Sequence, residues 1–206
     1  MKIALSAAAF LMSIAAVAAH AEPLKAFKLT VGEQTIDIDA GESVEVTLPD
    51  GSKTTASLQR NDFATYAGGT FSFNHPSAYN VARSDVGDNI VQHLMASALG
   101  TLVIVQEYSS LNPSTLTELM MQELTKETVG AGGTRSDEAV EHVLAGGEAF
   151  KGIRATVTYS GETSFYEVLT YGAQNSGIVA VTRIDEERTS TEGVMLSTFW
   201  ETLDLK

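Results

Sequence analysis

The chain has 206 residues, no cysteine and a formal net charge of −13. This length suits one domain with an appendage, or two small domains. The lack of cysteine excludes thiol catalysis, thiolate metal sites, disulfides and the lipid-bearing cysteine of bacterial lipoproteins. The acid excess disfavours nucleic acid and anionic membrane surfaces as partners, because both repel a negatively charged protein.

The first residues have the pattern of a secretory signal peptide. Lys2 precedes an apolar, alanine-rich run, and Ala19-His20-Ala21 is a small-x-small cleavage site. The alternative is a retained membrane anchor, but the run is short for the ~20 residues of a spanning helix. We therefore predict a signal peptide at residues 1–21, cleaved after Ala21, and a periplasmic or secreted chain without a stable membrane anchor. Its removal takes away one positive charge, so the mature net charge is −14.

Residues 22–66 are predicted to form an N-terminal β-hairpin region. Apolar and polar residues alternate from Phe27 to Val31 and again through Ile36 and Ile38, with Gly32-Glu33 as a two-residue turn between them. A second pair of strands flanks Pro49-Asp50-Gly51, and the sequence is consistent with these hairpins forming either a small separate sheet or an extension of the main one. The segment from Asn61 to Gly69 is interpreted as a linker.

Residues 67–206 are predicted to form the main domain. Its first strand, Phe71-Ser72-Phe73, ends at Pro76. Strands at 79–83 and 89–95 pair around residues 85–88, and the β-branched run 102–105 is expected to be a central strand. The stretch 137–144 fits either a short strand or a helical turn.

Two helices are predicted. The first follows Asn112, an N-cap candidate, with Pro113 at its first position and Glu118 near the positive end of the helix dipole. Its apolar stripe is Leu116, Leu119, Met120, Met121 and Leu124. The second helix begins near 189–191 and has Leu196, Phe199, Trp200 and Leu203 on one face. We expect Trp200 to anchor this helix to the sheet, with ligand stacking as the alternative.

Three successive strands between Gly146 and Ile184 organise the fold. Residues 153–160 alternate apolar and polar side chains, whereas the runs around Val168 and Val179 are apolar on both faces. Strands of that kind require cover on both sides. The sequence therefore predicts an α+β fold: a largely antiparallel sheet covered by helices on both faces, which is an α/β/α sandwich, after an N-terminal β-hairpin extension.

From Thr70 onward, the order of elements resembles the PsbP/DcrB-like group of α/β/α sandwiches. The matching features are the strand ending at Pro76, the helix from Pro113, the run from Gly152-Ile153, the strands around Val168 and Val179, and the helix ending near Leu203. The resemblance implies a non-enzymatic binder or assembly factor. The chain departs from the DcrB-like lipoproteins because it has no lipid-acceptor cysteine, and residues before Thr70 match nothing in the group.

Few residues form a pattern that is typical of a catalytic or metal-binding site. His75, His93 and His142 lack the spacing of a local metal pair, and the sequence has neither a G-x-S-x-G nor an S-x-x-K motif. Asp37–Glu42 and Asp85–Asn89 are short, incomplete calcium-loop patterns, which more often form strand edges and turns. We assign no catalytic, cofactor-binding or metal-binding residue and expect no cofactor.

Three functions remain open at this point. The first is an exported, non-catalytic binding or assembly accessory protein with a protein partner in the cell envelope. The second is a secreted hydrolase with a dispersed active site, which requires His75, His93 or His142 within hydrogen-bond reach of a serine or a carboxylate. The third is a carrier of a small ligand or cation that uses the N-terminal hairpins.

Overall fold

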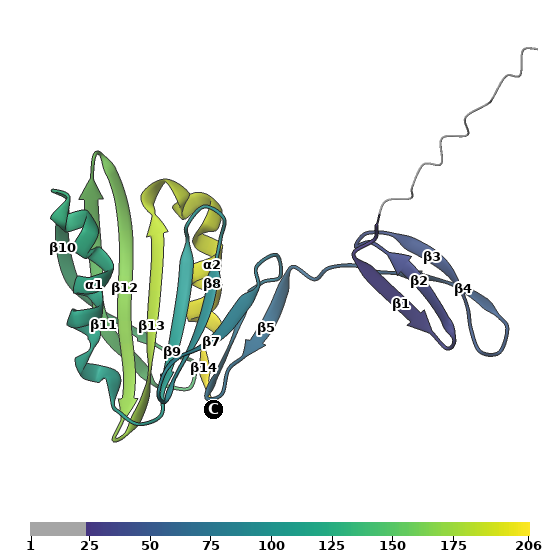
Figure 1. Ribbon diagram of the computed structural model, residues 1–206, viewed down its shortest axis with the longest axis horizontal. Helices are drawn as coiled ribbons and strands as arrows, with labels where there is room; N and C mark the ends of the chain where they lie inside the picture. Colours follow the sequence, from purple (N-terminus) through teal and green to yellow (C-terminus); the bar gives the residue numbers. More distant parts are fainter. Residues whose placement is uncertain (1–23) are drawn as a thin grey trace, which may run out of the picture. The chain divides into compact units, whose positions relative to one another are not determined.

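The computed structural model describes residues 24–206, and the predicted signal peptide lies outside this range. Within it, no helix has both the length and the apolar character required to cross a membrane. The described chain divides into two compact units, one ending at Arg60 and the other comprising Asn61–Lys206 (Figure 1).

The smaller unit consists of the two predicted hairpins. Strands β1 (Phe27–Val31) and β2 (Gln34–Ile38) pair with each other, as do β3 (Ser43–Thr47) and β4 (Lys53–Ser57). Gly32 and Gly51 lie in the turns with positive φ angles of 59° and 82°, which glycine adopts without steric cost. Ile38 and Val46 are its buried apolar side chains.

The larger unit is built on one seven-stranded antiparallel sheet. Its strands are arranged in space as β10-β11-β12-β13-β9-β8-β7, and the run predicted as a central strand is β9. Residues 137–143 of the ambiguous stretch 137–144 lie in strand β10. The bounds are β7 (Val81–Gly87), β8 (Ile90–Ala96), β9 (Leu102–Tyr108), β10 (Thr134–Val143), β11 (Ala149–Tyr159), β12 (Glu162–Ala173) and β13 (Ser176–Asp185).

A second, three-stranded sheet and two helices complete the larger unit. This sheet has the order β14-β6-β5, and its strands are β5 (Phe63–Ala67), β6 (Phe71–Pro76) and β14 (Asp204–Leu205). The segment 61–69, expected to be a linker, thus contains a paired strand. The helices are η1 (Pro113–Thr115), α1 (Thr117–Gly130), η2 (Glu186–Arg188) and α2 (Thr189–Thr202). Asn112 caps η1, accepting a hydrogen bond from the Ser114 amide at 3.0 Å.

The central strands are buried on both faces, as predicted. Val179 and Val181 of β13 belong to an apolar cluster on the α1 side of the sheet. Leu169 and Ala180 belong to a second cluster on the opposite side, together with Phe199 of α2. All five side chains are at most 1% exposed. The pattern of apolar residues on both strand faces therefore identified the interior of the sheet.

The prediction that helices cover both faces is wrong. The described chain is 53% strand and 19% helix, with only two α-helices. Helix α1 contacts β10, β11 and β12, whereas α2 contacts β13 and β6. A helix with its side chains is about 10–12 Å wide, and strands lie about 4.8 Å apart, so one helix covers about two to three of the seven strands. On the α2 side, β6 of the small sheet supplies further cover through Phe71 and Phe73.

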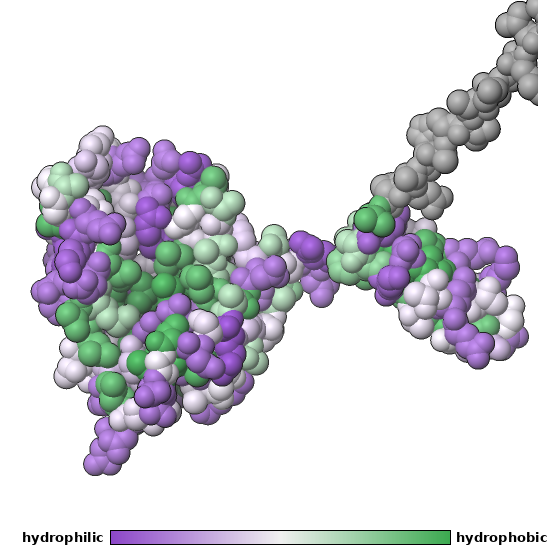
Figure 2. Space-filling model, in the orientation of Figure 1, coloured by the Kyte–Doolittle hydropathy of each residue, from purple (hydrophilic) through white to green (hydrophobic). Residues whose placement is uncertain are grey.

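Half of each sheet face consequently lacks a covering helix. On the α1 side, half-buried apolar residues of β8 and β9 remain accessible, and Figure 2 shows hydrophobic surface over the middle of the larger unit, where Figure 1 places β12, β13 and β9. These accessible residues are Ile90, Leu94, Leu102 and Ile104. On the α2 side, the open half lies over β10, β11 and β12, and it contains the candidate site.

Candidate functional site

A row of polar side chains crosses the sheet on its α2 side. The strand registers place Glu138 of β10 opposite Arg154 of β11, Arg154 opposite Glu167 of β12, and Glu167 opposite Thr182 of β13. Directly opposed residues share one face and lie close enough to interact. The row thus alternates in charge and brings a carboxylate into the interior of the sheet.

The sequence analysis missed this row, although the hairpin register carries a signal for it. Ser160 and Gly161 both have positive φ, at 52° and 86°, as a two-residue primed turn requires. Such a turn fixes the register, so counting back from it pairs Arg154 with Glu167. Glu167 is also a charged residue in an otherwise apolar strand, and a buried charge needs a partner.

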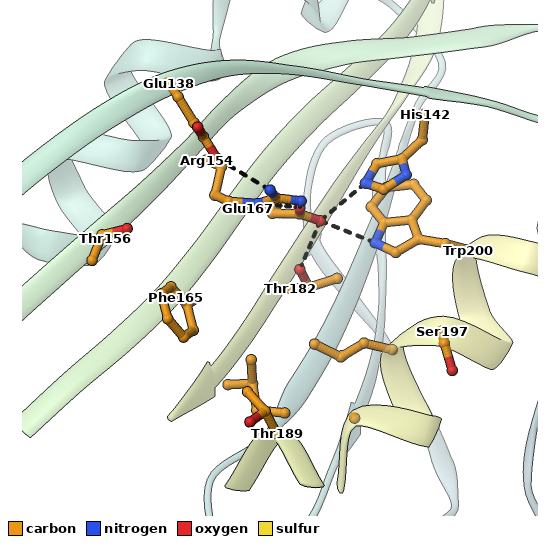
Figure 3. A pocket seen from close by; sticks show the side chains of 13 residues that line it. Glu138, His142, Arg154, Thr156, Phe165, Glu167, Thr182, Thr189, Ser197 and Trp200 are labelled. Carbon is orange, nitrogen blue, oxygen red and sulfur yellow. Dashed lines mark hydrogen bonds and ion pairs between the residues drawn. The ribbon is translucent and has the colours of Figure 1, made fainter. Parts of the chain in front are cut away.

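Glu167 is the centre of the site, and its carboxylate accepts five hydrogen bonds (Figure 3). Arg154 donates to Oε1 from Nε at 2.8 Å and from Nη2 at 2.5 Å. Oε2 accepts from Trp200 Nε1 at 3.1 Å, from Thr182 Oγ1 at 3.4 Å, and bonds to His142 Nε2 at 3.2 Å. A carboxylate offers about four lone-pair sites, so these donors use its full capacity.

Burial and hydrogen bonding act on Glu167 in opposite directions. Glu167 is only 8% exposed. Burial alone would raise its pKa, but hydrogen bonds and charge interactions with His142 and Arg154 outweigh that effect, and the pKa of Glu167 is lowered below its usual value. Arg154 responds similarly: burial opposes its charge, yet Glu167 and Glu138 raise the pKa of its guanidinium. The pair therefore stays ionised at neutral pH.

The lowered pKa of Glu167 predicts a specific loss of stability in acid. A carboxyl group with a depressed folded-state pKa stabilises the fold above its unfolded pKa of about 4.3, and this contribution disappears as the pH falls through the folded value. We expect the difference in unfolding free energy between wild type and Glu167→Gln to shrink below about pH 4.3. Urea titrations across that range measure it, and a difference that stays constant would contradict the assignment.

Trp200 and His142 form one end of the site. Their rings stack with centroids 4.1 Å apart and an interplanar angle of 10°. Trp200 comes from α2 and His142 from β10, so Glu167 ties the helix to the edge of the sheet through both residues (Figure 3). The expectation that Trp200 anchors α2 to the sheet is confirmed.

A cavity of about 480 Å³ opens beside this group, between α2 and the uncovered strands. Its floor is the polar row, and one wall is α2, which contributes Thr189, Gly193, Leu196 and Ser197. Phe165 of β12 (Figure 3) and Ile184 of β13 add apolar surface. The cavity therefore combines a polar floor with largely apolar walls, the usual composition of a ligand pocket.

The three histidines occupy different environments. His93 is buried at 2% exposed, with Nε2 2.9 Å from Glu107 Oε2 and Nδ1 2.7 Å from the Tyr66 hydroxyl. His142 contacts Glu167, while His75 Nδ1 lies 3.0 Å from the Pro76 carbonyl oxygen. Two histidines thus meet carboxylates, as a dispersed hydrolase site requires. In the part of the chain that the structure describes, however, no serine hydroxyl is hydrogen-bonded to any of these rings.

Glu107 resembles Glu167 in being paired inside the protein. Burial alone would raise its pKa, but hydrogen bonds from Thr70, His93 and the Gly69 amide outweigh burial and lower it. The Thr70 amide and hydroxyl both donate to Oε1 at 2.6 Å. This carboxylate secures the start of β6 against β9.

The two short calcium patterns are occupied by basic side chains. Lys25 forms ion pairs with Glu42 and with Asp39, the latter at 3.6 Å. In the second pattern, Arg83 Nη2 lies 3.3 Å from Asp85. Across residues 24–206, no three histidine, aspartate or glutamate side chains converge as a metal site would require.

Comparisons with known proteins give structural matches only. No protein-family model and no curated protein matches the sequence. Among solved structures, cyanobacterial PsbP (CyanoP) from Synechocystis sp. PCC 6803 is similar, with 10% identity, a TM-score of 0.47, and 73% of this chain and 96% of that chain covered. A protein from Bacteroides thetaiotaomicron VPI-5482 matches with 12% identity, a TM-score of 0.36, and 66% and 45% covered.

The first match is a PsbP protein, the family that the order of elements resembles. The DcrB-like part of the resemblance stays a prediction. Both TM-scores lie below 0.5 and both identities are low, so a function has to come from the residues of this chain itself.

Proposed function

We propose that the protein is a non-catalytic binding protein and that the cavity beside Glu167 is its binding site. The observation that carries this proposal is the saturation of the Glu167 carboxylate next to an open cavity. A carboxylate whose acceptor sites are all used and whose pKa is lowered is a poor general base and a poor nucleophile. It is well suited to hold Arg154, His142 and Trp200 in fixed positions.

The contacts of His93 and His142 also support a non-catalytic function. His93 has both ring nitrogens bonded and is buried, so it has no access to a substrate. A hydrolase would need a nucleophile beside His142, and the groups that contact its ring are the Glu167 carboxylate, whose acceptor sites are all used, and the indole of Trp200. A fixed polar floor with apolar walls favours recognition over reaction.

We further propose that the mature chain begins after Ala21, is exported to the periplasm or secreted, and meets a protein partner in the cell envelope. The leader-like residues 1–21 support export. The accessible apolar residues of β8 and β9 support a protein partner, since exposed apolar surface of this kind often marks an interaction site.

A screen that follows both binding and turnover tests the proposal. The full mature chain is mixed with peptides, metabolites and envelope extract fractions, and its melting temperature is recorded, because a ligand that binds only the folded state raises it. We expect ligands that raise the melting temperature and are recovered chemically unchanged. A compound that wild type converts to product, and that His142→Ala leaves intact, would contradict the proposal and favour a hydrolase.

A further inference from the structure

Building on the proposed binding function, we propose that the cavity between α2 and the open half of the sheet takes an uncharged peptide: a ligand with backbone amides and one apolar side chain. The charges of the floor, the hydrogen-bonding groups that remain available and the apolar walls each restrict the ligand, and together they leave this class.

The charge of the floor disfavours anionic ligands. Glu138 and Glu167 flank Arg154 in the polar row, so two carboxylates face one guanidinium. Both acids already pair with Arg154, Glu167 at 2.5 Å and Glu138 at 3.1 Å. An added carboxylate would meet two fixed carboxylates and an arginine that already pairs with both of them, in a strongly acidic protein.

The same pairing disfavours a cationic ligand. Glu167 has no acceptor site left for a cation, so only Glu138 could bind one, and that carboxylate is 64% exposed, where an ion pair is worth little. An uncharged ligand leaves all of these contacts in place.

Polar groups of both kinds remain for an uncharged ligand. A guanidinium carries five N–H donors, and Arg154 uses three of them on Glu167 and Glu138. The remaining N–H groups suit a carbonyl oxygen. Thr156 also lines the cavity and its hydroxyl can donate or accept, whereas the hydroxyl of Ser197, which donates to the Val194 carbonyl oxygen at 3.4 Å, can accept. A peptide amide, with one acceptor and one donor, matches this set.

The walls provide room and apolar contact for a side chain. Phe165 of β12 lies on the sheet side of the cavity (Figure 3), and Leu196, which belongs to α2, lines it from the helix side. Gly193 of α2 also lines it, and a Cβ at this position would meet no heavy atom within 4 Å, so the space above the glycine is open. A volume of about 480 Å³ lies within the usual range for small-ligand sites.

The test uses the chain's only tryptophan as its reporter, because Trp200 lines the cavity. The probes are N-acetylated, C-amidated tripeptides with a central leucine or phenylalanine, compared with the same peptides bearing a free carboxylate or a lysine. They are titrated against the full mature chain while tryptophan fluorescence is followed. We expect the capped peptides to bind at least about tenfold more tightly than either charged form.

A pair of neighbouring substitutions shows whether binding occurs in the cavity. Gly193→Leu places a side chain in the open space and improves the helix propensity of α2, so we expect the folded state to persist and the affinity to fall at least about tenfold. Val194→Leu changes an exposed residue, 51% accessible and outside the cavity lining, and should leave the affinity unchanged. A longer capped peptide carrying the same core shows whether a protein segment or only a short free peptide is accepted.

Three results would overturn the inference. A charged probe that binds more tightly than the capped one refutes the ligand class while the binding function stands. Capped peptides that bind Gly193→Leu as well as wild type refute the location. If no tripeptide changes the fluorescence, this ligand class is wrong, and the wider ligand screen then decides the binding function separately.

Discussion

Replacing Phe199 with alanine is expected to lower the free energy of unfolding by about 4 kcal/mol. The Phe199 side chain is fully buried, and its ring meets Phe73 of β6 edge-on at a centroid distance of 5.0 Å. It therefore joins α2 to both sheets of the larger unit. Its removal leaves a cavity that the surrounding strands cannot close, since they are fixed by their own pairing. Urea denaturation of the full mature chain measures the loss.

A matched control for Phe199→Ala lies on the same helix. Val194 is 51% exposed, and its replacement by alanine should change the unfolding free energy by no more than about 0.5 kcal/mol. If both variants lose similar stability, α2 is not docked through the Phe199 face. Helix α2 would then not form the wall of the proposed binding cavity as described.

Replacing Glu167 with alanine is expected to lower the free energy of unfolding by about 3 kcal/mol. The substitution leaves the Trp200 indole N–H and part of Arg154 without the carboxylate of Glu167, which is only 8% exposed, as their acceptor. We place the effect at the low end for a buried pair because the Arg154 side chain is 39% exposed and can still be hydrated.

Glu138 provides the control for Glu167, because it pairs with the same arginine from the surface. Its side chain is 64% exposed, so Glu138→Gln should cost less than about 1 kcal/mol. Equal losses for Glu138→Gln and Glu167→Ala would show that Arg154, rather than the buried carboxylate, holds the floor together. Urea titrations of both variants at neutral pH make the comparison.

Much of the sheet could be predicted because its signals are local. Alternation with a period of two and glycine-bearing turns located most strands of both units, including the hairpin around Gly32, but not β5, which lies in the expected linker. Apolar residues on both faces of a strand identified its central position, as for Val179 and Ala180. Each of these signals involves residues that are near one another in the chain.

How the helices pack on the sheet could not be predicted from such local signals. The stripe expected on α1 was only partly correct: Met121 is fully buried, but Leu119 and Leu124 are 55% and 37% exposed, and Thr125 takes a buried position instead. Residues spaced by four advance about 40° around a helix at each step, so such a series drifts off one face. The number of strands that a helix covers depends on the width of the helix and the spacing of the strands. Neither can be derived from the periodicity of apolar residues in the sequence.

One part of the candidate site could be predicted from the sequence, and the other part could not. The pairing of Arg154 with Glu167 follows from a two-residue turn and could have been derived from the sequence. The approach of His142 and Trp200 to the same carboxylate depends on how β10 and α2 pack, and these residues are 58 positions apart in the sequence. No local pattern joins them.

The central claim is that buried Glu167, with all its acceptor sites occupied, holds the floor of a binding cavity. The most direct test is the indole N–H signal of Trp200 in a proton–nitrogen correlation spectrum. The chain has a single tryptophan, so this signal needs no assignment. We predict one signal that exchanges slowly with water, because the N–H is bonded to Glu167, and that moves when the capped leucine tripeptide is added. An indole proton that exchanges at the rate of an exposed tryptophan, and that no ligand shifts, would contradict both parts of this claim.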